Sequence, residues 1–324
     1  MITELEVRRA DSTDPRPAWA VQGPTELSIY QTVRCNLHCS FCLLEHAGTP
    51  QVPDVTPELI ANVIDRFPTL RTACIAGFGE PLLSRFLMDN IYFLRDRGLY
   101  IGLVTNGTLV RRRLKDLFPG SLGHVNVSVN ATTAAEWSEL CQRPTSEFYE
   151  IVDGFDFLHR LRTPVYASYV VTRRNYLKME RFIVVARDLG AQGINFVNLL
   201  PTHGEPYDTR SGFWDLVITD EDQDAVSYID WLKGHKFAAM VHAWPQPISR
   251  HGCPSLCDSP FRMIGIDGAG RVTACRRVSP PTVDSPSFQA GFAGPFWDSY
   301  RESMLGHAML EDKCRMCFGN WKAL

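Results

Sequence analysis

Three features are missing from this sequence, and each absence excludes a class of protein. There is no excess of positive charge, since 33 Lys and Arg residues stand against 36 Asp and Glu residues, for a net charge of −3. A broad nucleic-acid-binding face needs such an excess, so we expect no nucleic-acid partner. No apolar run reaches the roughly 18 residues of a membrane-spanning helix, so no membrane partner is expected. Residues 1–17 are charged and polar, unlike a secretion signal, which predicts a cytoplasmic protein.

The sequence does contain ten cysteines among its 324 residues. The cytosol keeps thiols reduced, so cysteines clustered at short spacings favour metal binding over disulfides. Eight of them fall into an N-terminal and a C-terminal group: Cys35, Cys39 and Cys42, then Cys253, Cys257, Cys275, Cys314 and Cys317. The two isolated cysteines, Cys74 in an apolar strand and Cys141 near a helix end, are interpreted as packing residues.

Apolar strands alternate with helical segments about six times in the first two thirds of the chain. Strands are expected at 26–31, 73–76, 100–105, 125–130, 165–172 and 193–200, and helices from 56 and at 84–97, 110–118, 133–141, 147–161 and 177–189. Such alternation predicts an α/β fold with a parallel sheet. Six units are fewer than the eight of a closed barrel, so we expect a partial (β/α)6 TIM-like barrel.

The domain prediction has three parts: a polar N-terminal segment (1–24), the partial barrel (25–235) and a small C-terminal domain (236–324). A helix at 219–232 precedes the last part, which is expected to contain a hairpin at 263–275 with a Gly-rich turn.

The first cysteine group has the spacing Cys-x3-Cys-x2-Cys directly after the first strand. Three thiolates on one loop can bind three irons of a [4Fe–4S] cluster and leave the fourth iron open to an external ligand. A structural zinc site is the alternative, with His38 or His46 as the fourth ligand.

This spacing, with Phe41 before the last cysteine, resembles the radical S-adenosylmethionine (SAM) superfamily. Gly79-Glu80-Pro81 after the second strand is similar to that family's Gly-Gly-Glu-Pro motif, with Phe78 in place of the first glycine and Gly77 before it. The resemblance implies that the three cysteines hold a [4Fe–4S] cluster and that SAM is bound. The implied SAM contacts are Phe41, Gly79, Glu80, Pro81, Thr105, Asn106, Ser128, Asn130, Asn198 and Leu200.

The second group resembles the "twitch" form of the SPASM extension of the same superfamily. Its pattern is Cys257, then Gly270-x4-Cys275, then Cys314-x2-Cys317. The resemblance implies a second, auxiliary [4Fe–4S] cluster on these four cysteines, whereas a four-cysteine zinc ribbon uses similar spacings and is the alternative. The spacing is most similar to that of aminocyclitol-oxidising radical SAM dehydrogenases.

The resemblance implies a radical SAM oxidoreductase or epimerase. It would generate a 5′-deoxyadenosyl radical and abstract a hydrogen atom from a small molecule, oxidising or epimerising a carbinol carbon of a sugar, aminocyclitol or nucleoside-like intermediate in natural-product biosynthesis. Cys253 is a candidate hydrogen-atom donor for epimerisation, and His203, Glu205 and Arg277 are candidate substrate contacts. The expected reducing partner is a flavodoxin or ferredoxin, for which the basic run 111–113 is a candidate surface, although a solvated helix face is the simpler interpretation.

Two alternatives stay open. Residues 1–24 leave no room for a domain that recognises a leader peptide, which favours a small molecule, but modification of a ribosomally made peptide by epimerisation or crosslinking keeps the same radical chemistry. A non-catalytic zinc-binding protein is the alternative from another class.

Overall fold

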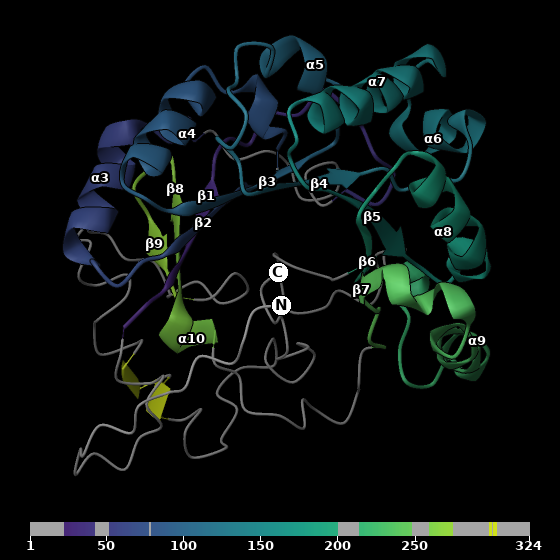
Figure 1. Ribbon diagram of the computed structural model, residues 1–324. Coiled ribbons are helices and arrows are strands. Elements are labelled where there is room, and N and C mark those ends of the chain that lie inside the picture. Colours follow the sequence, from purple (N-terminus) through teal and green to yellow (C-terminus); the bar gives the residue numbers. More distant parts are fainter. Residues whose placement is uncertain are drawn as a thin grey trace.

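The computed structural model describes residues 23–42, 52–77, 79–199, 214–247, 259–274, 298–299 and 301–302. These residues form a curved sheet with helices packed along its outer face (Figure 1). The strands are β1 (Glu26–Tyr30), β2 (Thr72–Ala76), β3 (Tyr100–Thr105), β4 (His124–Ser128), β5 (Val165–Val171), β6 (Gly193–Asn198), β7 (Val241–Ala243), β8 (Met263–Asp267) and β9 (Val272–Thr273).

The helices fill the connections between these strands. They are α3 (Pro57–Arg66), α4 (Leu87–Asp96), α5 (Val110–Arg113), α6 (Ala134–Cys141), α7 (Ser146–Arg160), α8 (Met179–Asp188), α9 (Gln223–Lys233) and α10 (Ser259–Arg262), with 3₁₀ turns η1 (Pro81–Leu83), η2 (Tyr176–Lys178), η3 (Trp214–Leu216) and η4 (Lys236–Met240). None of the helices in the described ranges is long and apolar enough to cross a membrane.

The sheet order is β7-β6-β5-β4-β3-β2-β1-β8-β9, and every neighbouring pair is parallel except β8 and β9. The expected α/β fold with a parallel sheet of six consecutive strands is therefore confirmed. The sheet also extends beyond these six strands. β7 adds to β6, and β8 pairs with β1 in register from Glu26 opposite Met263 to Tyr30 opposite Asp267. The expected hairpin is the antiparallel pair β8–β9.

Alternate residues of each strand face the helices and form the core. Leu27 and Ile29 of β1, for example, are 1% and 0% exposed, as is Ile75 of β2 at 0%. Because side chains alternate along a strand, the residues between them face the concave side of the sheet. The parallel arrangement also brings the carboxyl ends of β1 to β8 to one edge, where the loops that carry the motifs meet.

Two helices are shorter than the sequence predicted. The helix expected at 84–97 begins at Leu87, because the preceding residues form the turn η1 and Ser84 is extended. The basic helix expected at 110–118 ends at Arg113, because the chain turns before Gly120, whose φ is +81°. By contrast, α3 starts as predicted, with Pro57 at its first position and the Thr56 hydroxyl accepting from the Leu59 N–H at 3.5 Å.

Candidate active site

The three-cysteine loop follows β1 at the carboxyl edge of the sheet. The buried side chain of Leu37 anchors it, and the Cys42 N–H donates to the Cys39 carbonyl at 2.8 Å, which closes a tight turn. The end of α6 holds the other side of the turn, since the Ser40 N–H donates to the Leu140 carbonyl at 2.9 Å. The loop is therefore fixed between β1 and α6.

The electrostatics of this loop favour a neutral Cys35 thiol when no metal is bound. Desolvation and the nearby charges of Glu80, Cys39 and Cys42 raise the pKa of Cys35 to about 11, although a backbone hydrogen bond from Leu37 opposes the shift. A bound metal reverses this preference, because it deprotonates a coordinating thiol. Within the described ranges, no three His, Cys, Asp or Glu side chains stand close enough to hold one metal ion. A cubane binds each cysteine at a different iron, so it needs no such convergence.

Glu80 is the most strongly held side chain at this edge. It is 2% exposed, and one carboxylate oxygen accepts from the Thr105 hydroxyl at 2.7 Å and the Leu82 N–H at 3.0 Å. Its other oxygen accepts from the Asn106 N–H at 2.6 Å. Burial nevertheless dominates these hydrogen bonds and raises the pKa of Glu80 to about 6. Thr105 and Asn106, expected as SAM contacts, thus orient the Glu80 carboxylate.

The backbone at Gly79 lies directly against the cysteine loop. The Glu80 N–H donates to the Arg34 carbonyl at 2.7 Å, and the Gly79 N–H donates to the Thr32 carbonyl at 3.2 Å. A Cβ atom on Gly79 would lie 2.3 Å from the Arg34 oxygen, so only glycine fits. Gly77, the residue before Phe78, has a φ of +145°, which glycine adopts readily. Phe78 itself lies outside the described residues.

Asn36 joins the cysteine loop to the loop after β3. Its side chain accepts from the Asn106 amide at 2.9 Å and donates to the Thr108 hydroxyl at 2.9 Å. The Thr108 hydroxyl in turn donates to the Asn106 side-chain oxygen at 2.7 Å. The residue next to Cys35 is therefore tied to the loop that positions Glu80.

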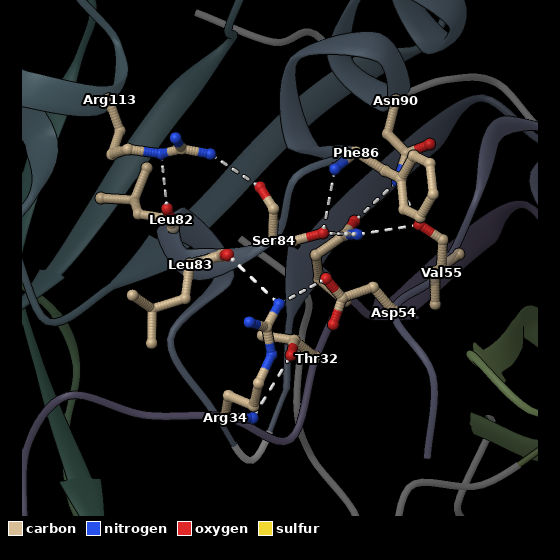
Figure 2. Close-up of polar contacts among 11 residues, drawn as sticks. Thr32, Arg34, Asp54, Val55, Leu82, Leu83, Ser84, Phe86, Asn90 and Arg113 are labelled. Atoms are coloured by element: carbon tan, nitrogen blue, oxygen red, sulfur yellow. Dashed lines mark hydrogen bonds and ion pairs between the residues drawn. The ribbon is translucent and has the colours of Figure 1, made fainter.

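A buried polar network supports η1, the turn that follows Glu80 (Figure 2). Gln31 is 0% exposed and donates to the Ser84 hydroxyl at 2.9 Å, while Asn90 donates to the Gln31 oxygen at 2.8 Å. From the other side, Arg113 donates to the Leu82 carbonyl at 2.8 Å and to the Ser84 carbonyl at 2.9 Å. Arg111, Arg112 and Arg113 are all exposed, as in a solvated helix face, but Arg113 also supports η1 through these two hydrogen bonds.

Three further predicted SAM contacts lie at or just after strand carboxyl ends, whereas Phe41 is in the cysteine loop and Pro81 begins η1. Ser128 ends β4. Asn130 has a φ of +57°, and its side-chain oxygen accepts from the Val170 N–H at 2.9 Å. The Asn198 amide at the end of β6 pairs with the backbone of Gln246, accepting from its N–H at 2.7 Å and donating to its carbonyl.

Several predicted site residues lie outside the described residues. They are the candidate donor Cys253, the second cysteine group Cys257, Cys275, Cys314 and Cys317, the substrate candidates His203, Glu205 and Arg277, and the SAM candidate Leu200.

Sequence reasoning missed the residues that hold the predicted ones in place. Asn36 and Thr108 lie within one residue of recognised motifs, which was a usable signal. Gln31 and Asn90 are 59 positions apart and have no motif to link them. Cys141, interpreted as a packing residue, is indeed buried, yet its sulfur lies 3.6 Å from the sulfur of Cys39.

Residues 29–186 match the Radical SAM superfamily. They include the three-cysteine loop, the Glu80 pocket and the loop after β3 described above. This region of the chain is a radical SAM domain, and members of this family use SAM and a [4Fe–4S] cluster.

Two curated relatives and one solved structure extend this result. The "tungsten-containing aldehyde ferredoxin oxidoreductase cofactor-modifying protein" of Pyrococcus furiosus is 27% identical to this chain. The match covers 52% of this chain and only half, 50%, of the length of that protein. A "probable GTP 3′,8-cyclase" of Saccharolobus solfataricus is 22% identical over 88% of this chain and 92% of its own length. The solved structure of "native anSMEcpe with bound AdoMet and Cp18Cys peptide" superposes with a TM-score of 0.63 at 15% identity, over 91% of this chain and 86% of that chain. At this identity, the structural similarity shows the shared fold.

Proposed function

We propose that this chain is a radical SAM enzyme that abstracts a hydrogen atom from a small molecule. One observation carries the proposal: the Asn36 hydrogen bonds join a three-cysteine loop to a buried carboxylate pocket at one sheet edge. Cys35, Cys39 and Cys42 would hold a [4Fe–4S] cluster with one open iron, and the donor set fits, because cluster iron prefers thiolates. When bound, the cluster and SAM supply a 5′-deoxyadenosyl radical, the chemistry of this family.

The roles of the surrounding residues follow from their contacts. The Glu80 carboxylate, fixed by Thr105, Asn106 and Leu82, would accept hydrogen bonds from the methionyl ammonium group of SAM. The glycine backbone at Gly79 lets this pocket approach the cysteine loop. Ser128 and Asn130, at the next strand end, would contact the rest of SAM together with Phe41, Pro81, Asn198 and Leu200. The protein's task is to orient SAM and the substrate and to exclude competing reactions.

For the substrate, we propose a sugar, aminocyclitol or nucleoside-like metabolite whose carbinol carbon is oxidised or epimerised. The relative named as a GTP cyclase, which this chain matches over 88% of its length, supports the small-molecule class. A ribosomal peptide is the second candidate, favoured by the fold shared with a structure that holds a peptide. Besides β7, β8 and β9, which join the barrel sheet, the residues 236–324 would form a twitch-type domain with a second [4Fe–4S] cluster on Cys257, Cys275, Cys314 and Cys317. A flavodoxin or ferredoxin would supply electrons.

Two measurements test the class of the protein. Anaerobically purified protein should be brown and bind about eight irons, roughly four per cubane. A triple variant with Cys35→Ala, Cys39→Ala and Cys42→Ala should retain about four irons. A colourless protein with stoichiometric zinc would overturn the proposal. Incubation of the wild type with SAM and a strong reductant should yield 5′-deoxyadenosine, and its formation should rise above the uncoupled background when the right candidate substrate is added.

A solvent-isotope experiment separates the two reaction types. Turnover in heavy water should place deuterium at the product carbon if a thiol quenches the substrate radical, and Cys253→Ala should abolish that incorporation. A ketone product without deuterium at that carbon identifies oxidation instead. Cys74→Ala is the matched control, because it removes a cysteine of a core strand.

A further inference from the structure

Cys141 contacts a predicted cluster ligand although the two residues are 102 positions apart. It is the last residue of α6, is 2% exposed, and its Sγ lies 3.6 Å from the Cys39 Sγ. The backbone on both sides of Cys39 is tied to the same helix end. The His38 N–H donates to the Cys141 carbonyl at 3.2 Å, and the Ser40 N–H donates to the Leu140 carbonyl at 2.9 Å. Three consecutive residues of the loop therefore contact the last two residues of α6.

The position of the Cys141 sulfur is fixed by the packing of α6. Trp137, one helical turn earlier on the same face, is 0% exposed. The Thr133 hydroxyl caps the start of the helix by accepting from the Glu136 N–H at 3.1 Å, and Gln142 ends it in the left-handed conformation with a φ of +53°. Because both helix ends are fixed and the face is buried, the thiol cannot turn away into solvent.

This geometry suits a hydrogen bond from Cys141 to Cys39. A Cys39 sulfur bound to iron is a thiolate, which only accepts, whereas a neutral Cys141 thiol has one S–H to donate. A disulfide requires a sulfur–sulfur distance of about 2.05 Å, so the two sulfurs are separate thiols here. Hydrogen bonds to cluster sulfurs favour the reduced, more negative cluster and raise its potential.

We propose that Cys141 is a positioning residue that donates a hydrogen bond to the Cys39 ligand and makes the radical SAM cluster easier to reduce. The inference rests on the proposed function, because Cys39 must bind the cluster. No covalent step is involved, and Cys141 touches neither SAM nor substrate. Removing this one weak hydrogen bond is expected to lower the ratio of reduced to oxidised cluster by about threefold to tenfold at a fixed potential. A tenfold change corresponds to a shift of about 59 mV in the midpoint potential of a one-electron couple.

The test compares variants with and without a donor at this position. Cys141→Val fills the buried space without a donor, Cys141→Ala repeats the test with a smaller side chain, and Cys141→Ser restores an O–H donor. Cys74→Ala is the matched cysteine control. Each full-length protein is titrated anaerobically with a reductant while the electron paramagnetic resonance signal that changes on SAM addition is followed, which identifies the radical SAM cluster. Iron content and helix content by circular dichroism are measured in parallel.

We expect Cys141→Val and Cys141→Ala to lower the midpoint potential while iron content and the SAM-induced spectral change stay at wild-type values. Cys141→Ser and Cys74→Ala should retain the wild-type potential. An unchanged potential in both variants without a donor overturns the inference. Loss of iron and of the SAM response in a folded variant also overturns it, because Cys141 would then be a ligand. A Cys39–Cys141 disulfide in peptide maps of the anaerobic holoprotein would overturn it too.

The outcome also separates this inference from the proposed function. A wild-type protein with no SAM-responsive cluster contradicts both. A wild-type protein with such a cluster, whose potential does not depend on Cys141, contradicts the role of Cys141 alone.

Discussion

At the scale of single residues, the site depends on a carboxylate that the fold makes costly to ionise. Glu80 is buried, and three hydrogen-bond donors do not fully offset its desolvation, so its pKa rises to about 6. Because this folded-state pKa lies above the usual value of 4.5, ionisation at neutral pH destabilises the free protein. This cost decreases as the pH falls through about 6 and is lost below about 4.5. A cationic ligand at Glu80 would offset the same cost at neutral pH.

The first prediction concerns the pH dependence of SAM binding. Only ionised Glu80 can pair with the methionyl ammonium group, so affinity should reach a plateau above pH 7 and be about tenfold weaker at pH 5, one unit below the Glu80 pKa of about 6. Isothermal titration calorimetry of the anaerobic holoprotein between pH 5 and pH 8 measures this. A SAM affinity that is constant over the range would argue against Glu80 as the ammonium partner.

The second prediction concerns Gly79. Gly79→Ala would place a Cβ atom 2.3 Å from the Arg34 carbonyl oxygen, so the backbone between the cysteine loop and Glu80 must separate. We expect SAM affinity to fall at least tenfold and the free energy of unfolding to drop by about 2 kcal/mol. Gly234→Ala is the matched control, because Gly234 has a φ of −78° and its Cβ would lie 3.4 Å from its nearest neighbour, the Trp231 carbonyl oxygen. Equal SAM affinities of the two variants would refute the close-approach argument.

At the scale of elements, the turn η1 is held between α4, α5 and the end of β1. Gln31 and Asn90 fix one side of it from within the core, and Arg113 fixes the other by two hydrogen bonds to its carbonyls. Since η1 begins directly after Glu80, the orientation of this short helix sets the direction of the carboxylate.

The third prediction tests this support. Arg113→Met keeps the aliphatic stem of the side chain but removes both hydrogen bonds to η1. We expect SAM affinity to fall about fivefold to tenfold, which corresponds to roughly 1 kcal/mol, the net value of a typical hydrogen bond. Arg113→Lys should recover part of the loss. Arg112→Met, one position earlier in α5 and exposed, is the matched control. The prediction fails if the Arg112 and Arg113 variants bind SAM equally well.

At the scale of the whole molecule, the sheet includes a strand from the part of the chain predicted to form a separate C-terminal domain. β8 pairs in parallel with β1 along all five residues, and its Ile264 and Ile266 are 0% and 1% exposed. The radical SAM domain therefore shares its sheet and core with residues beyond its family match, which ends at residue 186.

The fourth prediction follows from this shared core. Ile264→Ala should lower the free energy of unfolding by about 2–4 kcal/mol, as expected for truncating a buried aliphatic side chain. The loss should appear in the main cooperative transition of the barrel, followed by circular dichroism in urea. Leu177→Ala, at a position that is 64% exposed, should change little. An early, separate transition that leaves the main one unaltered would show that β8 is not part of the barrel's cooperative unit.

The sequence predicted the six alternating units of the parallel sheet and the places of the motifs at strand ends, because both depend on local hydrophobic patterning and on loops that follow strands. It did not predict which side chains pair. The Thr105 hydroxyl and the Asn106 backbone N–H, both in the stretch expected to contact SAM, donate to Glu80, and this contact depends on the approach of two loops about 25 positions apart. The contact between Cys39 and Cys141 depends on where α6 ends relative to β1. Local hydrophobic patterning gives neither the separation of these two loops nor the separation of the end of α6 from β1.

The pairing of β1 with β8 also bears on how the chain is made. β1 ends at residue 30 and its partner starts at residue 263, so a ribosome adding about 5–20 residues per second completes the second strand roughly 10 to 50 s after the first. During that interval the nascent sheet has an open edge at its first strand, next to the cysteine loop. An open edge of apolar strand is a template for pairing with other chains. Slower synthesis lengthens this interval, so it should increase the loss of the protein to aggregation before its first strand is covered.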